Sequence, residues 1–528
     1  MGSRSETQVF ASAAVAAPHR AAAEAGRNVL AMGGNAVEAM VAMAATIAVV
    51  YPHMNSIGGD GFWLLREPRG RVRAFEACGP AGAGATLARY RKREYETIPP
   101  RGPDAALTVP GAVAGWAMAL DYARSIGGRL TLRDLLADAI RHAREGVPVS
   151  PSQARTQPDL APLLQAPGFA EVYLREGKIP AAGTVLRYEA LAATLDHLAQ
   201  QGLDDFYRGD VGREIAGDLE RIGSPVTRED LRRFEARVRE PLALKLRGRT
   251  HYNFPPPTQG LASLLILGMF ERLGARPESF AETHGLVEAT KRAFAIRDRL
   301  CIDPAFSEAR PQEALDPRVL DREASLIDMG RAAPYPVRPA KGDTIWMGAV
   351  DAEGYAVSYI QSTYWEYGSG CLLPRTGVLM QNRGISFSLD ERAANPLSPG
   401  RKPFHTLNPA LAAFDDGRVM PYGTMGGDGQ PQVQAQVFTR VNVGMGLAEA
   451  LDAPRFVFGR TWGAASTRLA MEEEFDPSIT RALEKAGHDV ALQPRSDAFG
   501  HAGALIRHPK GRVEAGHDPR ADGGAEGL

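Results

Sequence analysis

The chain has 528 residues, enough for one large layered body or for several domains, so length alone does not choose between these architectures. Its 61 Lys and Arg residues nearly balance its 62 Asp and Glu residues, which gives a formal net charge of -1. Such a balance gives no excess of positive charge that would indicate binding to nucleic acid or to an anionic membrane. We therefore expect a small polar substrate.

We expect neither a secretion signal nor a membrane-spanning segment. Residues 1–17 contain the acidic Glu6 and only a short Ala and Val run, which is too weak for the core of a signal peptide. The longest apolar run, residues 36–50, contains Glu38 and falls short of the roughly 20 residues that span a bilayer. The three cysteines are widely spaced and form no Cys-x-x-Cys pair: Cys78, Cys301 and Cys371. We therefore expect reduced core thiols in a cytoplasmic protein.

The first hundred residues alternate helix-like and strand-like segments. Residues 20–32 are Ala-rich and stop at a glycine pair, which predicts a helix, and residues 36–49 predict a second, apolar helix. A Gly-rich turn at 58–61 then leads into a strand at 62–65, and residues 72–76 follow as its hairpin partner.

Residues 107–299 are mostly helical in their hydrophobic period, most clearly at 130–143 and 282–299. The polar, Pro-containing stretch 316–338 then approaches Lys341. It is the kind of exposed connection that tolerates a cut in the chain.

From Thr344 onwards the pattern changes to strands. Residues 344–350 and 355–363 are rich in β-branched and aromatic residues and flank a turn at 351–354. They predict a hairpin that returns Ser362 to the side of Thr344. Further strands are expected at 377–380, 407–414 and 419–424, and a helix near 432–442.

Thr344 is the candidate nucleophile. A threonine that becomes the first residue of a chain carries a nucleophile and a base together, because its hydroxyl lies beside its own free amine. A terminal amine has a pKa of about 8, near enough to neutral to accept a proton at working pH. Taken alone, however, Thr344 would be an ordinary strand residue.

Short motifs accompany Thr344 along both halves of the chain. In the first half they lie at 14–19, 33–37, 57–62, 109–115 and 144–146. In the second half they lie at 341–351, 368–370, 402–409, 426–427 and 453–455. In this order they resemble the γ-glutamyltransferase family of N-terminal-nucleophile hydrolases over nearly the whole chain.

The resemblance implies a precursor that is cut between Asp343 and Thr344. A large chain of residues 1–343 and a small chain of residues 344–528 would stay associated in one intertwined body, and a dimer of such heterodimers is one assembly that the family allows. The fold would be α+β, a four-layer αββα sandwich. The Thr344 hydroxyl would first attack the carbonyl of Asp343 and then form an acyl-enzyme with a small-molecule amide, without any cofactor.

Three further positions match the catalytic machinery of the family. Ser362 would orient the Thr344 hydroxyl, and the backbone N–H groups of Gly426 and Gly427 would form the oxyanion hole, since glycine leaves their approach open. As bare sequence, Ser362 would be a strand residue and the glycine pair could be a turn or a phosphate loop. No Gly-Lys-Ser/Thr ending follows the pair, so we discount nucleotide binding.

The substrate pocket departs from that of the transferases in the residues that hold an amino acid. Glu76 stands where they have the arginine that binds the donor α-carboxylate, and Ser386 stands where they have the aspartate that binds its α-amine. Tyr364 replaces their asparagine. We expect Glu76 to be structural, and Arg73, an odd number of strand steps away, to face the other side of the sheet.

Arg383 adds a cation to this pocket, and His405 and Thr406 replace the two serines of the transferases. A pocket that loses the amine-binding carboxylate and gains an arginine suits a carboxylate without an α-amine, held by a bidentate guanidinium pair. Two plainer interpretations stay open: Arg383 could pair structurally with Glu366 or Asp390, and His405 could be a satisfied core histidine.

The combination resembles the oxamate amidohydrolase-like branch of the family more than the transferases. It favours a self-processing amidohydrolase that converts oxamate to oxalate and ammonia. A γ-glutamyl hydrolase or transferase acting on glutathione, or a related acylase, remains an alternative, as does an unprocessed, non-catalytic paralogue. No His, Cys or carboxylate group has the sequence spacing of metal ligands, so no metal is expected.

Overall fold

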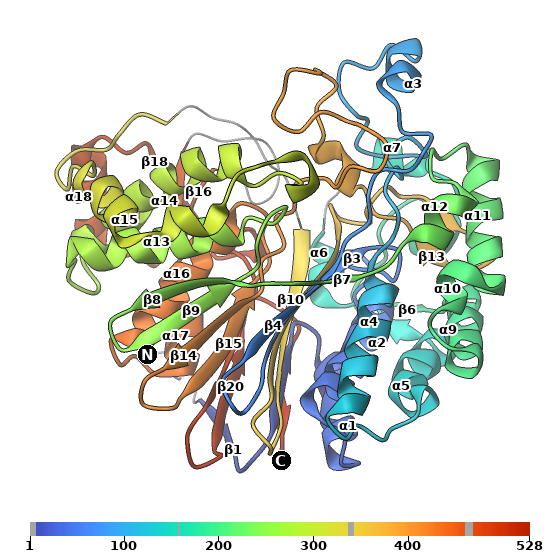
Figure 1. Ribbon diagram of the computed structural model, residues 1–528, viewed down its shortest axis with the longest axis horizontal. Helices are drawn as coiled ribbons and strands as arrows, with labels where there is room; N and C mark the ends of the chain where they lie inside the picture. The colour runs from blue at the N-terminus through green and yellow to red at the C-terminus, as the bar shows by residue number, and fades with distance from the viewer. Residues whose placement is uncertain (1–6, 157–158, 336–342, 460–467) are drawn as a thin grey trace.

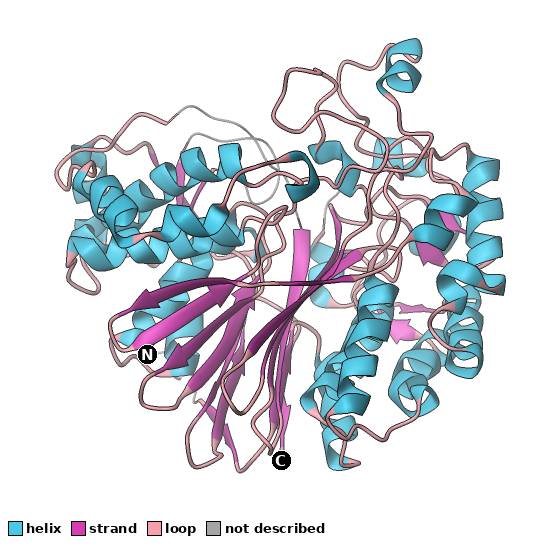
Figure 2. Ribbon diagram, viewed as in Figure 1, coloured by secondary structure: helices cyan, strands magenta, loops and turns pink. Residues whose placement is uncertain are grey.

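Two seven-stranded antiparallel sheets stack face to face at the centre of the protein, and helices cover both outer faces (Figures 1 and 2). The computed structural model describes residues 7–156, 159–335, 343–459 and 468–528. This is the expected α+β, four-layer αββα sandwich. No described helix is both long and apolar enough to cross a membrane.

The sheet that contains Thr344, here called the Thr344 sheet, has strands from both halves of the chain. Its order is β21 (Gly524–Gly527), β2 (Ala14–Ala17), β10 (Asp343–Val350), β11 (Ala356–Tyr364), β3 (Asp60–Arg66), β4 (Val72–Ala77) and β7 (Arg237–Arg239). The β10–β11 hairpin therefore lies between strands that precede residue 343.

The second sheet, here called the facing sheet, is also built from both halves. Its order is β1 (Gln8–Phe10), β20 (Val513–His517), β19 (Ala502–Arg507), β15 (Val419–Thr424), β14 (Ala410–Phe414), β9 (Arg249–Asn253) and β8 (Leu242–Leu246). The helical period expected over 107–299 is thus wrong for β7, β8 and β9, which are short strands that gain their stability from pairing inside the two sheets.

Each sheet packs its outer face on its own helices. The Thr344 sheet is covered by α1 (Arg20–Ala31), α2 (Ala36–Val50) and α4 (Ala112–Ser125), with α5 (Leu132–Glu145) packed on α2 and α9 (Glu189–Gln201) behind α5. The facing sheet is covered by α13 (Gly260–Leu273), α16 (Gly429–Asn442) and α17 (Leu447–Asp452), with α14 (Phe280–Leu300), α15 (Pro317–Ser325) and α18 (Pro477–Ala486) farther out. The helices expected at 20–32, 36–49, 130–143, 282–299 and 432–442 are confirmed.

Shorter elements complete the structure. The remaining helices are α3 (Leu87–Lys92), α6 (Pro151–Arg155), α7 (Leu160–Leu164), α8 (Phe169–Tyr173), α10 (Asp205–Arg208), α11 (Asp210–Ile222) and α12 (Arg228–Arg233), with 3-10 turns η1 (Pro304–Phe306), η2 (Pro311–Leu315), η3 (Arg383–Ser386) and η4 (Asp497–Phe499). The remaining strands are β5 (Val147–Pro148), β6 (Val185–Leu186), β12 (Leu372–Leu373), β13 (Val378–Leu379), β16 (Phe456–Phe458), β17 (Leu469–Glu472) and β18 (Val490–Gln493).

Helix α2 is buried along its whole length, and its acidic residue has a capping role. Glu38 completes a capping box with Asn35, and its second oxygen accepts the N–H of Leu130 at 3.0 Å. The turn of the β10–β11 hairpin is fixed to the start of the same helix, because the Asp351 carboxylate accepts the N–H of Ala36 at 2.9 Å. The hairpin therefore has a defined position above α2.

Trp346 on β10 fills the space between the two sheets. Strand alternation sends Ile345 and Met347 towards the helices and Trp346 towards the facing sheet. There its indole lies where Gly423 and Gly503 have no side chain. A Cβ at either glycine would overlap the indole ring.

We expect Gly503→Ala to lower the free energy of unfolding by about 1–3 kcal/mol, because the new methyl group overpacks the Trp346 ring in a close-packed core. Gly524→Ala in β21 is the matched control, since no atom lies within 4 Å of the Cβ it would add. Urea unfolding measures both variants. Equal stability of the two would show that the inter-sheet spacing around Trp346 is adaptable.

Candidate active site

Thr344 is fully buried near the start of β10, at an irregularity of the strand. Asp343 pairs with Tyr364 of β11 and Ile345 pairs with Gln361, so the register shifts across Thr344. Bulges of this kind are common beside active sites because they turn a backbone group out of the regular ladder. Trp346, two positions later on the same strand, points between the sheets.

Ser362 and Asp60 belong to the same face. On β11, Ser358 and Ile360 point between the sheets, and Ser362 continues their alternation. In the neighbouring pair of strands Ser362 lies opposite Asp60, the first residue of β3. The Ser362 Oγ accepts the backbone N–H of Tyr364 at 2.8 Å. The structure therefore brings Ser362 to the part of the sheet where Thr344 lies.

Gly426 and Gly427 lie in the loop that joins β15 of the facing sheet to α16. Their φ angles of 115° and 51° are in the left-handed region, where glycine is the favoured residue. The Gln259 side chain donates to the carbonyl of Gly427 at 2.7 Å and so fixes the loop. Within the described part of the chain, neither glycine N–H donates a hydrogen bond, so both are available to a developing oxyanion.

Arg383 is a fully buried cation with one polar contact. Its Nη1 donates to the Thr406 hydroxyl at 3.1 Å, and its guanidinium lies 3.8 Å from the centre of the Tyr364 ring. Its Nε and Nη2 have no hydrogen-bond partner in the described residues. Burial lowers the pKa of Arg383 to about 10, with the nearby Tyr364 and Asp60 opposing this effect, so the side chain is still charged at neutral pH.

The structural ion pair considered for Arg383 does not form. Glu366 instead approaches Arg101 at 3.5 Å, and Asp390 pairs with Arg392 at 3.2 Å. Across the described ranges, no carboxylate lies within ion-pair distance of Arg383. Unpaired buried charge is costly, so Arg383 stays the predicted contact for a ligand carboxylate.

His405 is buried but not satisfied, so the interpretation as a satisfied core histidine is wrong. Neither of its ring nitrogens has a hydrogen-bond partner among the described residues, and its Nε2 lies 3.5 Å from Asp60 Oδ2. Burial, followed by the charges of Arg383 and Lys402, holds the pKa of His405 well below its usual value. The imidazole is therefore neutral.

Asp60 is a site residue that the sequence does not single out. It stands inside the Gly-rich turn at 58–61, where an aspartate is unremarkable. Its Oδ1 accepts the N–H groups of Gly79 at 3.1 Å and Gly111 at 3.0 Å, while its Oδ2 has no hydrogen-bond partner in the described structure. A buried carboxylate within a glycine turn is the signal that could have identified it.

Three other predicted positions have structural contacts. Glu76 forms a buried ion pair with Lys402 and lies 3.8 Å from Arg239, which fits its expected structural role. Arg73 pairs with Glu67 at 2.5 Å, away from the inter-sheet face. Ser386 is half-buried and its hydroxyl donates to the carbonyl of Phe404 at 3.1 Å, so its contact with substrate stays a prediction.

The described residues contain one group with the geometry of metal ligands: His284 and Glu288 of α14, together with His488. The sequence does not indicate this group, because His488 lies about 200 positions after the two α14 residues. The three side chains already bind protein groups. His284 Nδ1 lies 2.8 Å from His488 Nε2, and Glu288 accepts from Lys291 at 2.7 Å and from the N–H of Ala333 at 3.1 Å.

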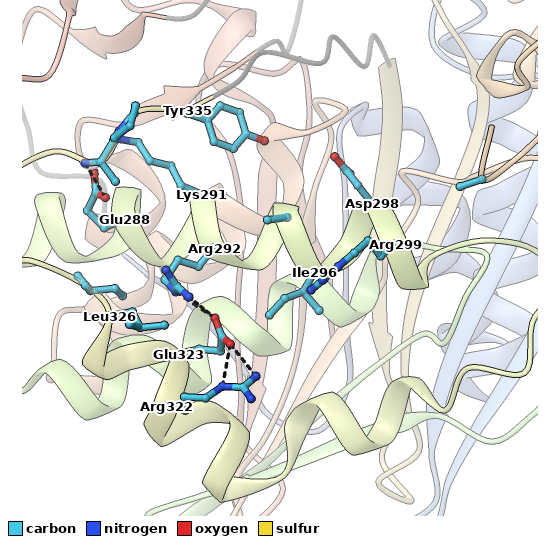
Figure 3. A pocket seen from close by; sticks show the side chains of 15 residues that line it. Glu288, Lys291, Arg292, Ile296, Asp298, Arg299, Arg322, Glu323, Leu326 and Tyr335 are labelled. Atoms are coloured by element: carbon cyan, nitrogen blue, oxygen red, sulfur yellow. Dashed lines mark hydrogen bonds and ion pairs between the residues drawn. The ribbon is translucent and has the colours of Figure 1, made fainter. Parts of the chain in front are cut away.

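A pocket of about 900 Å³ opens beside Glu288, between α14 and α15 (Figure 3). Charged side chains line it, and Arg292 and Arg322 both pair with Glu323 across its floor. None of the predicted site residues is among those that line it.

Comparison with known proteins agrees with this geometry. The profile of the Gamma-glutamyltranspeptidase family matches residues 22–528. The oxamate amidohydrolase proenzyme of Klebsiella pneumoniae is 49% identical over 517 residues, which cover 97% of this chain and 98% of that protein. A glutathione hydrolase-like proenzyme of Bacillus subtilis is 38% identical over 522 residues, with 97% and 98% covered.

Among solved structures, the cephalosporin acylase from Bacillus halodurans superposes with a TM-score of 0.89 at 30% sequence identity, covering 100% of this chain and 98% of that one. It shares the arrangement of two stacked sheets between helical layers. The chain therefore belongs to the gamma-glutamyltranspeptidase family and is an amidohydrolase of the N-terminal-nucleophile type.

Proposed function

We propose that the protein is a self-processing amidohydrolase that hydrolyses oxamate to oxalate and ammonia through an acyl-enzyme on Thr344. The observation that carries this proposal is the buried guanidinium of Arg383, whose Nε and Nη2 have no partner in the described residues. Such a group suits a small ligand whose carboxylate accepts two parallel hydrogen bonds. The 49% identical relative bears the name of this reaction.

Self-cleavage is the first step of the proposed mechanism. The Thr344 hydroxyl attacks the carbonyl of Asp343, an ester forms as the peptide C–N bond breaks, and the Thr344 nitrogen becomes a free amine. Water then hydrolyses the ester and restores the hydroxyl. Residues 1–343 and 344–528 would stay together, because β10 and β11 lie between β2 and β3 in one sheet.

Turnover repeats this chemistry on the substrate. The Thr344 amine accepts the proton of its own hydroxyl as the oxygen attacks the amide carbon. The N–H groups of Gly426 and Gly427 donate to the oxyanion, and Ser362 orients the nucleophile. The proton then leaves with ammonia as the C–N bond breaks, and water hydrolyses the acyl-enzyme. Arg383 holds the substrate carboxylate throughout.

A γ-glutamyl hydrolase is the second candidate, and one observation favours it. Asp60 Oδ2 is a buried carboxylate oxygen that has no hydrogen-bond partner in the described residues, and it could accept the α-ammonium of an amino-acid donor. The sequence indicates loss of the amine-binding carboxylate only at the position of Ser386. Asp60 lies elsewhere in the chain and does not belong to that comparison.

Replacing the nucleophile tests the self-processing step. We expect Thr344→Ala to remain a single 528-residue chain without amidase activity, and Thr344→Ser to be cut before residue 344. Denaturing gels and N-terminal sequencing of the small chain measure this. A wild-type protein that stays uncut while it hydrolyses amides would exclude the proposed mechanism.

Replacing the carboxylate-binding cation tests the substrate class. We expect Arg383→Met to lower kcat/KM for oxamate by about 100-fold, since the carboxylate loses its buried partner. The unliganded variant should unfold at no lower temperature, because burial already disfavours the Arg383 charge. Arg392→Met, which removes an exposed pair with Asp390, is the control. Equal kinetics in both variants would remove Arg383 from the site.

The two candidate functions differ in their substrates. We expect the cut enzyme to release ammonia from oxamate faster than from glutamine and to leave glutathione unchanged. Enzyme-coupled ammonia detection and thin-layer separation of γ-glutamyl products measure these rates side by side. Preference for glutathione or glutamine would instead establish the γ-glutamyl alternative and assign an amine to Asp60.

A further inference from the structure

The carboxyl of Asp60 is held by one of its oxygens, and its other oxygen lies beside His405. Backbone N–H groups from Gly79 and Gly111 fix Oδ1. A side chain at residue 111 would crowd this contact, because its Cβ would lie 2.9 Å from Oδ1. Oδ2 has no hydrogen-bond partner in the described residues and lies 3.5 Å from His405 Nε2.

Titratable and polar groups from several elements surround Asp60. They are Cys78 after β4, Tyr207 of α10, Tyr359 of β11, the Gln381 side chain, Arg383 of η3 and His405. Burial raises the pKa of the Cys78 thiol, and of both tyrosine hydroxyls, above their usual ranges, so these groups are neutral. His405 is neutral as well.

Arg383 is therefore the charged neighbour that acts on Asp60. Burial raises the pKa of Asp60 to about 7, although the hydrogen bond from Gly79 and the charge of Arg383 oppose the rise. Near neutral pH the unliganded pocket contains the Arg383 cation and the Asp60 carboxyl, which is divided between its ionised and neutral forms. The cut enzyme adds the Thr344 amine, which the proposed mechanism uses in its unprotonated form.

We propose that this pocket binds the carboxylate of its ligand together with one proton, which Asp60 accepts from solvent. This inference rests on the proposed role of Arg383 as the carboxylate-binding residue. A ligand carboxylate on Nε and Nη2 of Arg383 places a second anion beside one cation in a buried site, and two such carboxylates cannot both stay ionised. Protonated Asp60 can then donate to His405 Nε2 in the tautomer that carries the imidazole proton on Nδ1.

The proton also changes what the pocket offers to a ligand. A ligand carboxylate accepts hydrogen bonds and donates none. Ionised Asp60 therefore repels such a ligand, and neutral Asp60 does not. The pocket would thus select small anions without an amine. An α-ammonium group would do the opposite, because it stabilises the ionised form of Asp60.

Calorimetric titration of the cut enzyme with oxalate tests the inference, using buffer pairs of equal pH and different ionisation heats. The free pKa near 7 rises in the complex, so proton uptake should be near zero below pH ~6, about one half at pH ~7 and close to one at pH ~8. The Kd should rise about tenfold per pH unit above pH ~7.

Asp60→Asn is the decisive variant, because its amide can keep the contacts of Oδ1 while mimicking the neutral acid. It should bind oxalate as tightly at pH ~8 as wild type does at pH ~6, without proton uptake. Asp351→Asn is the control, since Asp351 is a buried carboxyl of raised pKa in the β10–β11 turn, outside the pocket. It should leave the uptake unchanged.

The outcomes separate this inference from the proposed function. Oxalate binding without proton uptake, or with uptake that persists in Asp60→Asn, overturns the inference alone. Asp60-dependent uptake in an enzyme that does not hydrolyse oxamate supports the inference and overturns the proposed substrate. Failure to bind oxalate overturns both, and binding of glutamate that is lost in Asp60→Asn then assigns Asp60 to an α-amine.

Discussion

The insertion of Trp346 between the two sheets sets the distance on which the site depends. Its indole N–H donates to Ser358 Oγ at 2.9 Å, and that hydroxyl donates to the carbonyl of Tyr422 on the facing sheet at 3.3 Å. Trp346 lies two residues after Thr344, and Gly423, which it packs against, lies three residues before Gly426. One buried side chain therefore sets the spacing between Thr344 and the loop that contains Gly426 and Gly427.

The buried arginines show how the protein treats charge inside and outside the pocket. Arg455 and Arg383 are both fully buried. Arg455 pairs with Asp518 and donates to the carbonyls of Gly500 and Leu451, at 2.8 and 2.6 Å. Arg383 has one hydroxyl contact instead. A structural arginine at the same depth thus has an acidic partner, and Arg383 has none among the described residues.

Local sequence signals were sufficient for much of the fold. The apolar helix at α2 and the β10–β11 hairpin follow from hydrophobic period and from the turn at 351–354, because these signals lie within a few residues of each other. Strands β8 and β9 were not foreseen, since five-residue strands inside a mainly helical region depend on partners far along the chain.

The candidate site divides in the same way. Thr344, Ser362 and the glycine pair stand in recognisable motifs, and so does Arg383. The juxtaposition of Asp60 with His405 does not follow from sequence, since 345 positions separate the two residues and only sheet packing joins them. Nor does the sequence show that Arg383 has no carboxylate beside it, because that is a property of its whole surroundings.

In the proposed mechanism, chemistry and specificity are carried by different parts of this fold. Thr344 and Ser362 lie on paired strands of the Thr344 sheet, where a shift of register would disrupt a core. Arg383 and Thr406 lie on loops, and the latter loop is linked to the oxyanion loop because Gln259 donates to the carbonyls of both Thr406 and Gly427. Substitutions in these loops can change the ligand while leaving the nucleophile in place, since rigid strands position catalysis and loops tolerate variation. That separation explains physically how one architecture is shared by proteins named for oxamate, glutathione and cephalosporin.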